Sequence, residues 1–566
     1  MKRLSFFFLQ LLFFFLFPNS LPFGENWGGV LAQSLSDAIK LTESEQFEKA
    51  ADTYKLLIQN ELTNGDNYFF YGENYFIQEL INSSFEPIDL DSAQLLYEKG
   101  IQKNPGNPIN YVGLGKIFWY KENSSEAKKK FYDAVQIISP TNKTASFTKK
   151  QKALVYLKIA ECYTKAKTKD LQEAINLLNK SLQEDPNNPE TYILIGDATL
   201  EQNPGDATQA IAQYKKAFDL DKKSTKALQR IGQLYGRAKN LSEALRNYQE
   251  ALKIDPNFAP AYREIAELYY RVNQYDAAIT NYKKYLELNN GSISARVRYS
   301  SFLFLSKKYT ETVTNIKEIQ KQNQDIPFLY RILAYSYFET DNYADGLTAI
   351  EQFFAKTSEK KILASDYEYY GKLLFKLGKD SLAIEKLKIA IQQDTSKTEL
   401  NGEIGSSYMK MKKYPEAIDN YNKKIKGGQG IDVNDYYNLG RAYIYTTQFG
   451  KADTAFMQII ILRPDISTGY LWRAKANFMI DPKNEKFLAK PFFEEFLNKL
   501  KPEEIEKNKN NVIQSNEYLG FYYFVQKDYA KSKCHWQKVK EMEPSNEKAK
   551  KALADTNITR VSCTPN

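Results

Sequence analysis

The sequence predicts an all-α solenoid of stacked helix–turn–helix units, and two regularities carry this prediction. Small residues recur with gaps of 34, 34, 34, 37, 34 and 35, at Gly232, Ala266, Ser300, Ala334, Gly371, Gly405 and Gly440. A second small residue follows each of these by twelve positions, at Ala244, Ala278, Thr312, Gly346, Ala383, Ala417 and Ala452. A fixed period near 34 residues is typical of paired helices that pack only on their neighbours.

Residues 225–258 illustrate how one unit is expected to form. Ile231 and Tyr235 are four residues apart on the first helix, so their side chains share one helical face. Gly232 and Ala244 are small because the two antiparallel helices approach closely there. A larger residue at either position would cost about 1–3 kcal/mol of overpacking.

The units also share large and aromatic positions around these small residues. One unit carries Tyr111, Leu114, Gly115, Phe118, Ala127, Phe131 and Ala134, and a later unit carries Tyr436, Leu439, Gly440, Tyr443, Ala452, Phe456 and Pro464. In this pattern the chain resembles the tetratricopeptide repeat (TPR) family. The resemblance implies a right-handed superhelical solenoid of about 13–14 TPR units.

The unit boundaries follow from this register. After a partial first unit, units begin near Tyr68, Pro108, Ala153, Pro189, Thr225, Ala259, Ile293, Pro327, Ala364, Thr398, Val433, Ser467 and Ile513. The unit from Ser467 is irregular, because a longer loop follows Pro482. Residues 33–544 are expected to form the solenoid, and 545–566 a polar capping helix (546–556) followed by a frayed tail.

The N-terminus predicts export. Two basic residues precede a mostly apolar run, Leu4 to Phe17, which is shorter than the ~20 residues of a membrane-spanning helix. Residues 1–32 are therefore expected to be a signal peptide cleaved after Ala32, with cleavage after Ser20 or retention as an anchor left open. The expected location is the periplasm or the cell envelope.

The charge of the chain argues against nucleic-acid binding, and its few Cys and His residues have ordinary structural interpretations. The chain has 78 Lys and Arg against 69 Asp and Glu, a net charge of +9, with no basic stripe of the kind that binds nucleic acid. Cys162 is expected in the core, and pairing of Cys534 with Cys563 stays open. The single histidine, His535, is interpreted as part of an ordinary surface pair, because adjacent helical residues point about 100° apart.

No sequence motif predicts catalysis. The chain lacks a phosphate-binding loop of the Walker type and a Gly-x-Ser-x-Gly elbow, and it offers too few Cys and His residues for a zinc site. We therefore expect a protein that is not an enzyme and that needs neither cofactor nor metal.

The resemblance implies a concave groove lined by the first helix of each unit. Carried over by position, it predicts groove residues at Trp119, Tyr120, Arg263, Tyr270, Arg271, Arg331, Tyr335, Phe338, Tyr437, Arg441 and Tyr445. Arg and Tyr are enriched at binding hot spots because they combine contact area with directed hydrogen bonds. The family's clamp for a C-terminal carboxylate is incomplete: Lys226 and Arg230 match it, but Leu157, Glu161 and Leu194 do not.

These observations predict a non-enzymatic scaffold or adaptor of the cell envelope that binds peptide or helix segments of other proteins in its groove. The alternative is a carbohydrate-binding subunit in envelope polysaccharide or cell-wall assembly, since Tyr and Trp faces also stack on sugar rings.

Overall fold

The computed structural model describes residues 34–82, 89–139, 146–322 and 325–563, so the predicted signal peptide lies outside the described residues. These residues form two compact units that divide between Ala295 and Arg296. Within the described ranges the secondary structure is helical throughout, with no strand. The predicted all-α repeat architecture is confirmed.

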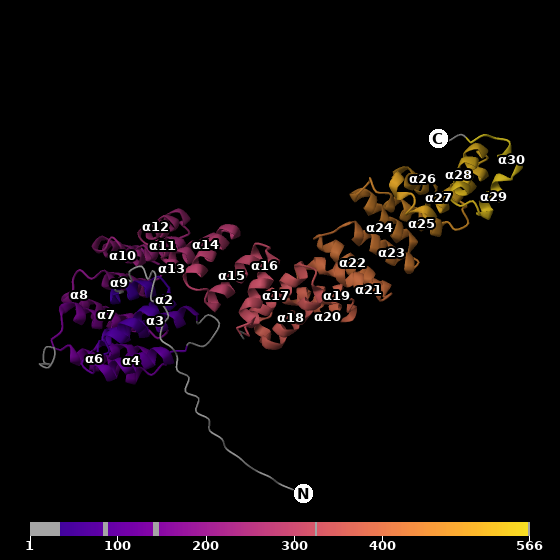
Figure 1. Cartoon of the computed structure of the whole chain (residues 1–566). Coiled ribbons are helices and arrows are strands. Elements are labelled where there is room, and N and C mark those ends of the chain that lie inside the picture. Colours follow the sequence, from indigo (N-terminus) through magenta and orange to yellow (C-terminus); the bar gives the residue numbers. More distant parts are fainter. Residues whose placement is uncertain (1–33, 83–88, 140–145, 323–324, 564–566) are drawn as a thin grey trace, which may run out of the picture. The chain divides into compact units, whose positions relative to one another are not determined.

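The described residues of the first unit (Figure 1) up to Leu288 form fourteen helices, which follow one another as seven antiparallel pairs. They are α1 (Leu35–Glu43), α2 (Phe47–Asn60), α3 (Gly65–Asn82), α4 (Asp91–Lys103), α5 (Ile109–Tyr120), α6 (Ser124–Ile137), α7 (Lys149–Lys165), α8 (Leu171–Glu184), α9 (Pro189–Gln202), α10 (Thr208–Leu220), α11 (Thr225–Arg237), α12 (Leu241–Ile254), α13 (Ala259–Arg271) and α14 (Tyr275–Leu288).

The second unit continues the same alternation of first and second helices. Its helices are α15 (Ile293–Leu305, which begins in the first unit), α16 (Tyr309–Gln320), α17 (Pro327–Glu339), α18 (Tyr343–Lys356), α19 (Ala364–Lys376), α20 (Asp380–Gln393), α21 (Asn401–Lys410), α22 (Tyr414–Gly427), α23 (Val433–Tyr445), α24 (Phe449–Leu462), α25 (Ser467–Ile480), α26 (Lys490–Lys499), α27 (Lys509–Val525), α28 (Tyr529–Met542), α29 (Glu547–Leu553) and α30 (Thr556–Thr559).

The two helices of a pair approach at the predicted small residues. A Cβ added to Gly232 on α11 would lie 2.6 Å from the ring of Tyr248 on α12, a residue that is 1% exposed. Ala244, which faces this contact from the second helix, is fully buried. The aromatic ring thus fills the space that the missing side chain leaves, which explains why a small residue recurs at this position.

The turn between the helices of a pair has its own repeated geometry. A residue with positive φ ends the first helix in many pairs, for example Glu122 (φ 60°), Lys239 (φ 57°) and Lys412 (φ 58°). The next residue then donates its N–H back to the helix, as Asn240 does to the carbonyl of Tyr235 at 2.9 Å. This closure resembles the left-handed helix caps usually made by glycine, but here it mostly uses polar residues.

The C-terminal end is more ordered than the predicted tail. The capping helix is α29, and α30 follows it with Ile558 fully buried. A disulfide joins Cys534 on α28 to Cys563, so residues 557–563 fold back onto the last pair. No described helix is long and apolar enough to span a membrane.

Candidate functional site

First helices of neighbouring pairs contact one another in both units, for example α3 with α5 and α17 with α19, and we call the face that the first helices present the first-helix surface. Its polar side chains in the first unit are largely paired with one another. Glu73 on α3 accepts from Lys116 on α5 at 2.9 and 3.1 Å, and from Lys158 on α7 at 3.2 Å. The Tyr97 hydroxyl donates to the same carboxylate at 2.8 Å.

This ladder of charges continues along α7, α9 and α11. Glu161 pairs with Lys158 at 2.8 Å and with Lys165 at 2.5 Å. Burial favours a raised pKa for Glu161, but the two lysines outweigh it and hold that pKa well below its ordinary value. Lys226 pairs with Glu190, and Arg230 with Asp197 at 3.0 Å. The lysine and arginine that matched the carboxylate clamp are therefore already engaged.

The chain segment after α1 closes the first-helix surface of this unit. Glu45 accepts from the Arg263 guanidinium at 2.5 and 2.6 Å and from the Tyr285 hydroxyl at 2.9 Å, and Ser44 donates to Asp255 at 3.3 Å. Figure 1 accordingly shows α2 beside α13. A cavity of about 330 Å³ remains behind this closure, lined by side chains of both charges. Arg263, a predicted groove residue, is therefore an internal contact.

Two other predicted groove residues of the first unit also lie inside it. Trp119 is 6% exposed, and its indole N–H donates to the carbonyl of Thr168 at 2.9 Å. The ring of Tyr120 packs edge-on against Phe76, with centroids 4.9 Å apart. Both side chains therefore stabilise the repeat stack. The aromatic character of α5 alone could not distinguish this role from partner binding.

Tyr270 and Arg271 lie at the end of α13. The Tyr270 ring is half-buried and meets Tyr275 with centroids 6.0 Å apart, whereas Arg271 is exposed. Of the predicted groove residues in the first unit, Arg271 is thus the one whose side chain lies open to solvent.

In the second unit, three predicted groove residues form a packed cluster. Arg331 on α17 binds both oxygens of Asp366 at 2.7 and 2.8 Å, and Asp366 is fully buried. The Tyr335 hydroxyl donates to the same carboxylate at 2.6 Å, and its ring stacks on Tyr369 at 3.9 Å. Phe338 meets Tyr369 edge-on at 5.4 Å. Arg331 and Tyr335 therefore join α17 to α19.

The remaining three predicted residues form an open patch on α23. Arg441 lies over the rings of Tyr437 and Tyr445, at 5.4 and 5.9 Å from their centroids. Tyr445 is 50% exposed and stacks on Tyr414 with centroids 4.5 Å apart. Tyr437 meets Trp472 of α25 edge-on. These side chains offer aromatic and cationic surface without a buried ion-pair partner.

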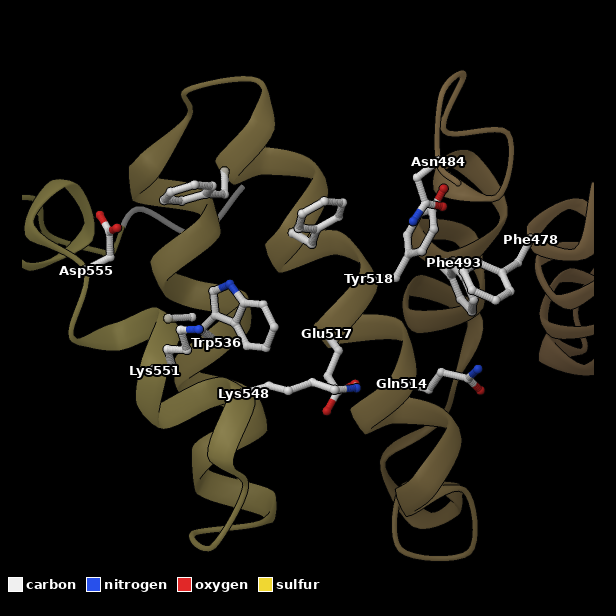
Figure 2. A pocket seen from close by; sticks show the side chains of 13 residues that line it. Phe478, Asn484, Phe493, Gln514, Glu517, Tyr518, Trp536, Lys548, Lys551 and Asp555 are labelled. Atoms are coloured by element: carbon white, nitrogen blue, oxygen red, sulfur yellow. The ribbon is translucent and has the colours of Figure 1, made fainter. Parts of the chain in front are cut away.

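Farther along the same surface lies a pocket of about 640 Å³, centred on α27 (Figure 2). Its walls are mainly aromatic, and charged side chains line the edge toward α29. The lining residues are Phe478, Asn484, Phe493, Gln514, Glu517, Tyr518, Phe521, Phe524, Trp536, Lys548, Lys551, Ala552 and Asp555. In Figure 2, Tyr518, Phe493 and Phe478 lie on one side and Trp536 on the other. The volume is within the ordinary range for ligand sites.

The loop between α25 and α26 forms part of this pocket. Asp481 accepts the backbone N–H groups of Glu485 and Lys486, both at 2.9 Å. Burial favours a raised pKa for Asp481, but these hydrogen bonds lower it overall. Asn484 and Phe487 both have positive φ, 57° and 52°. The pocket therefore forms at the irregular unit that begins at Ser467. The departure of this unit from the repeat is the sequence signal that could have indicated the pocket.

The residues considered for chemistry lie apart from the pocket lining. His535 is half-buried, contrary to its interpretation as a surface residue: its Nδ1 lies 2.8 Å from Asn516 Oδ1, and its ring stacks on Tyr523. Burial lowers the pKa of His535 to about 4. Cys162 is a buried free thiol, and burial raises its pKa. Across the described ranges, no group of three or more His, Cys, Asp or Glu could hold a metal ion.

Comparison with known proteins agrees with the repeat pattern. Four family models described as tetratricopeptide repeat match the chain, at residues 154–188, 225–258, 247–280 and 436–466. The chain is also similar to the C-terminal part of a TPR repeat-containing protein from Cytophaga hutchinsonii, with 35% identity over 46% of this chain and 100% of that structure, and a TM-score of 0.40. The chain belongs to the tetratricopeptide repeat superfamily.

Other solved structures resemble this TPR protein at lower identity. A tetratricopeptide repeat protein from Parabacteroides merdae is 21% identical over 45% of this chain and 99% of its own, with a TM-score of 0.30. The Cut9–Hcn1 hetero-tetramer of the APC/C contains a chain 13% identical over 92% of this chain and 96% of its own, with a TM-score of 0.29. No curated protein matches the chain.

Proposed function

We propose that this TPR protein is an exported scaffold of the cell envelope that holds partner proteins on the first-helix surface of its second unit. TPR repeats support a role in protein interaction in general. A difference between the two units favours the second as the one that binds partners. In the first unit the charged side chains pair with one another behind the closing segment. In the second unit, the α23 patch and the α27 pocket leave aromatic surface open.

Export is supported by two features of the chain. The N-terminal sequence has the basic start and short apolar run of a signal peptide. The disulfide between Cys534 and Cys563 is of a kind that persists in oxidising compartments outside the cytosol. Both features favour a periplasmic or envelope location.

A glycan partner is the second candidate, and the α23 patch is the observation that favours it. Tyr414 and Tyr445 stack as a half-exposed pair, and such ring faces can also lie against a sugar. A protein partner is preferred because Arg441 lies beside these rings, and Arg with Tyr is the combination enriched at protein interfaces.

Affinity capture from an envelope extract tests this proposal. The parent protein is compared with the double variant Arg441→Ala/Tyr445→Ala and with a control, Tyr132→Ala, which removes a 63% exposed tyrosine from α6. We expect the double variant to lose the partner, with binding weakened at least tenfold, since hot-spot residues each contribute about 2 kcal/mol or more. The control should capture it normally. Equal capture by all three proteins, or capture of glycan alone, would contradict the proposal.

A further inference from the structure

Two residues that line the aromatic pocket over α27 carry a buried polar atom with unused hydrogen-bonding capacity. The Tyr518 hydroxyl belongs to a side chain that is 7% exposed; its oxygen interacts with the backbone N–H of Ala489, but its proton has no acceptor among the described residues. The side-chain carbonyl Oδ1 of Asn484 is likewise buried and receives no hydrogen bond from the described part of the chain. Leaving such groups without a hydrogen bond destabilises the folded protein. One missing donor and one missing acceptor therefore line the same pocket.

The aromatic walls of the pocket restrict the chemistry of a ligand that can bind there. Phe493 and Phe478 flank the Tyr518 ring, with centroids 4.9 and 6.0 Å away, and Phe521 is 45% exposed at the opening. A sugar would bring several hydroxyls into this phenylalanine-rich wall, where most would find no hydrogen-bond partner. A large apolar side chain fits the walls better, since it gains about 25 cal/mol for each Å² of apolar surface buried.

We propose that this pocket binds an extended segment of a partner protein, with one large apolar side chain inserted between the rings and one main-chain amide held by Tyr518 and Asn484. A peptide group offers a carbonyl to the Tyr518 hydroxyl and an N–H to Asn484 Oδ1, which supplies the two missing partners. The paired side chains of Glu517 and Lys548, 2.7 Å apart, lie at the edge toward α29. The inference rests on the proposed scaffold function and names the partner chemistry of one site on that surface.

The local sequence explains how this pocket forms. The loop of residues 481–489 is longer than the corresponding turns, and it holds Asn484 in a left-handed conformation beside the rings. Gly520, on the face of α27 that meets α28, lets the Trp536 indole pack closely, since a Cβ there would lie 2.7 Å from the indole nitrogen. The added loop thus opens a space beside a helix pair that otherwise packs as the regular pairs do.

Binding of a capped amino acid to the purified full-length protein tests the assignment. The probe is N-acetyl-phenylalanine methylamide, observed by saturation-transfer NMR, with cellohexaose as the sugar comparison. A Kd of about 1 mM is expected for a probe of this size. Tyr518→Phe keeps the ring and removes only the hydroxyl, and Asn484→Gly removes the acceptor while tolerating the positive φ. Each should weaken binding about fivefold to tenfold.

Further variants separate binding from folding. Phe521→Ala should abolish detectable binding, whereas Tyr132→Ala should leave it unchanged. Because the Tyr518 hydroxyl proton has no acceptor, Tyr518→Phe should not lower the melting temperature of the free protein. Unchanged affinity in both polar variants, preference for cellohexaose, or no probe binding at about 10 mM would each overturn the inference. If the probe fails while Arg441→Ala/Tyr445→Ala still loses its captured partner, the scaffold function stands and only this pocket assignment falls.

Discussion

At the scale of single residues, burial decides what a side chain can do. His535 adjoins a disulfide-bonded cysteine, yet its ring is stacked on Tyr523 and hydrogen-bonded to Asn516. Burial and Lys531 lower its pKa to about 4, while Glu494 opposes that shift. The side chain is therefore neutral near pH 7 and belongs to the packing of the last helix pair.

His535 should make the second unit less stable in mild acid. Its folded pKa lies below its unfolded pKa of 6.5, so the unfolded chain binds the extra proton between pH 6.5 and about 4. The contribution of His535 to the free energy of unfolding is fully present above pH 6.5 and is lost as pH falls toward 4. The loss is at most about 3 kcal/mol. His535→Gln should flatten this dependence in urea unfolding, whereas Glu541→Gln on the same helix should not. A parallel pH slope in all three proteins would contradict the assignment.

At the scale of helices, the repeat depends on one close contact in each pair. A large side chain of the second helix lies over the small residue of the first, as Tyr248 lies over Gly232 and Leu387 over Gly371. The unit beginning at Ser467 departs from the repeat, and its loop frames the α27 pocket. Regular units thus build the stack, and the irregular one creates a cavity.

Adding one methyl group should test this contact. Gly232→Ala places a Cβ against the Tyr248 ring and should destabilise the first unit by about 1–3 kcal/mol. Gly450→Ala is the matched control, because a Cβ on that α24 glycine meets nothing within 4 Å and alanine favours the helix. Thermal unfolding monitored by circular dichroism should separate them. Equal melting temperatures would show that the helix register is wrong.

Lys226→Ala is not a neutral comparison for this test. Lys226 pairs with Glu190 and lies 3.7 Å from Glu43. The nearby carboxylates outweigh burial and raise its pKa above the ordinary lysine value. Removing its charge would leave those carboxylates without their partner.

At the scale of the whole molecule, long-range contacts decide which surface remains open. The segment after α1 reaches residues more than 200 positions later, through Glu45 with Arg263 and Tyr285. This closure and the ladder of paired charges engage the first-helix surface of the first unit. The open aromatic surface of the second unit is consequently the better candidate for binding.

The closing contact can be tested with two glutamates of similar backbone geometry. Glu45 and Glu122 have φ of 55° and 60°, but the Glu45 side chain is 7% exposed and that of Glu122 is 69% exposed. Glu45→Gln removes the closer of the two carboxylates paired with Arg263, leaving Glu264 at 3.6 Å, and should cost about 3 kcal/mol. Glu122→Gln should cost less than about 1 kcal/mol. Urea unfolding of both variants measures the difference, and similar losses would mean that the Glu45–Arg263 contact does not close the unit.

The sequence by itself determined the repeat. The period of small residues requires paired helices, because only small side chains let the helices approach, and it locates nearly every unit. The irregular unit after Ser467 was also visible in the sequence. The role of each groove residue was not, since two arginines predicted to line the groove differ in the structure: Arg331 is paired with Asp366, and Arg441 lies on open tyrosines.

Only the tertiary structure decided these roles, because the partners come from other units. Glu45 neutralises Arg263 across 218 residues, and Thr168, in the turn between α7 and α8 of the next pair, accepts the indole N–H of Trp119. The pocket over α27 likewise needs a loop, two helix pairs and the C-terminal cap together. Periodicity describes what each unit presents to its neighbours, whereas burial and ion pairing depend on which side chains meet after the chain has folded.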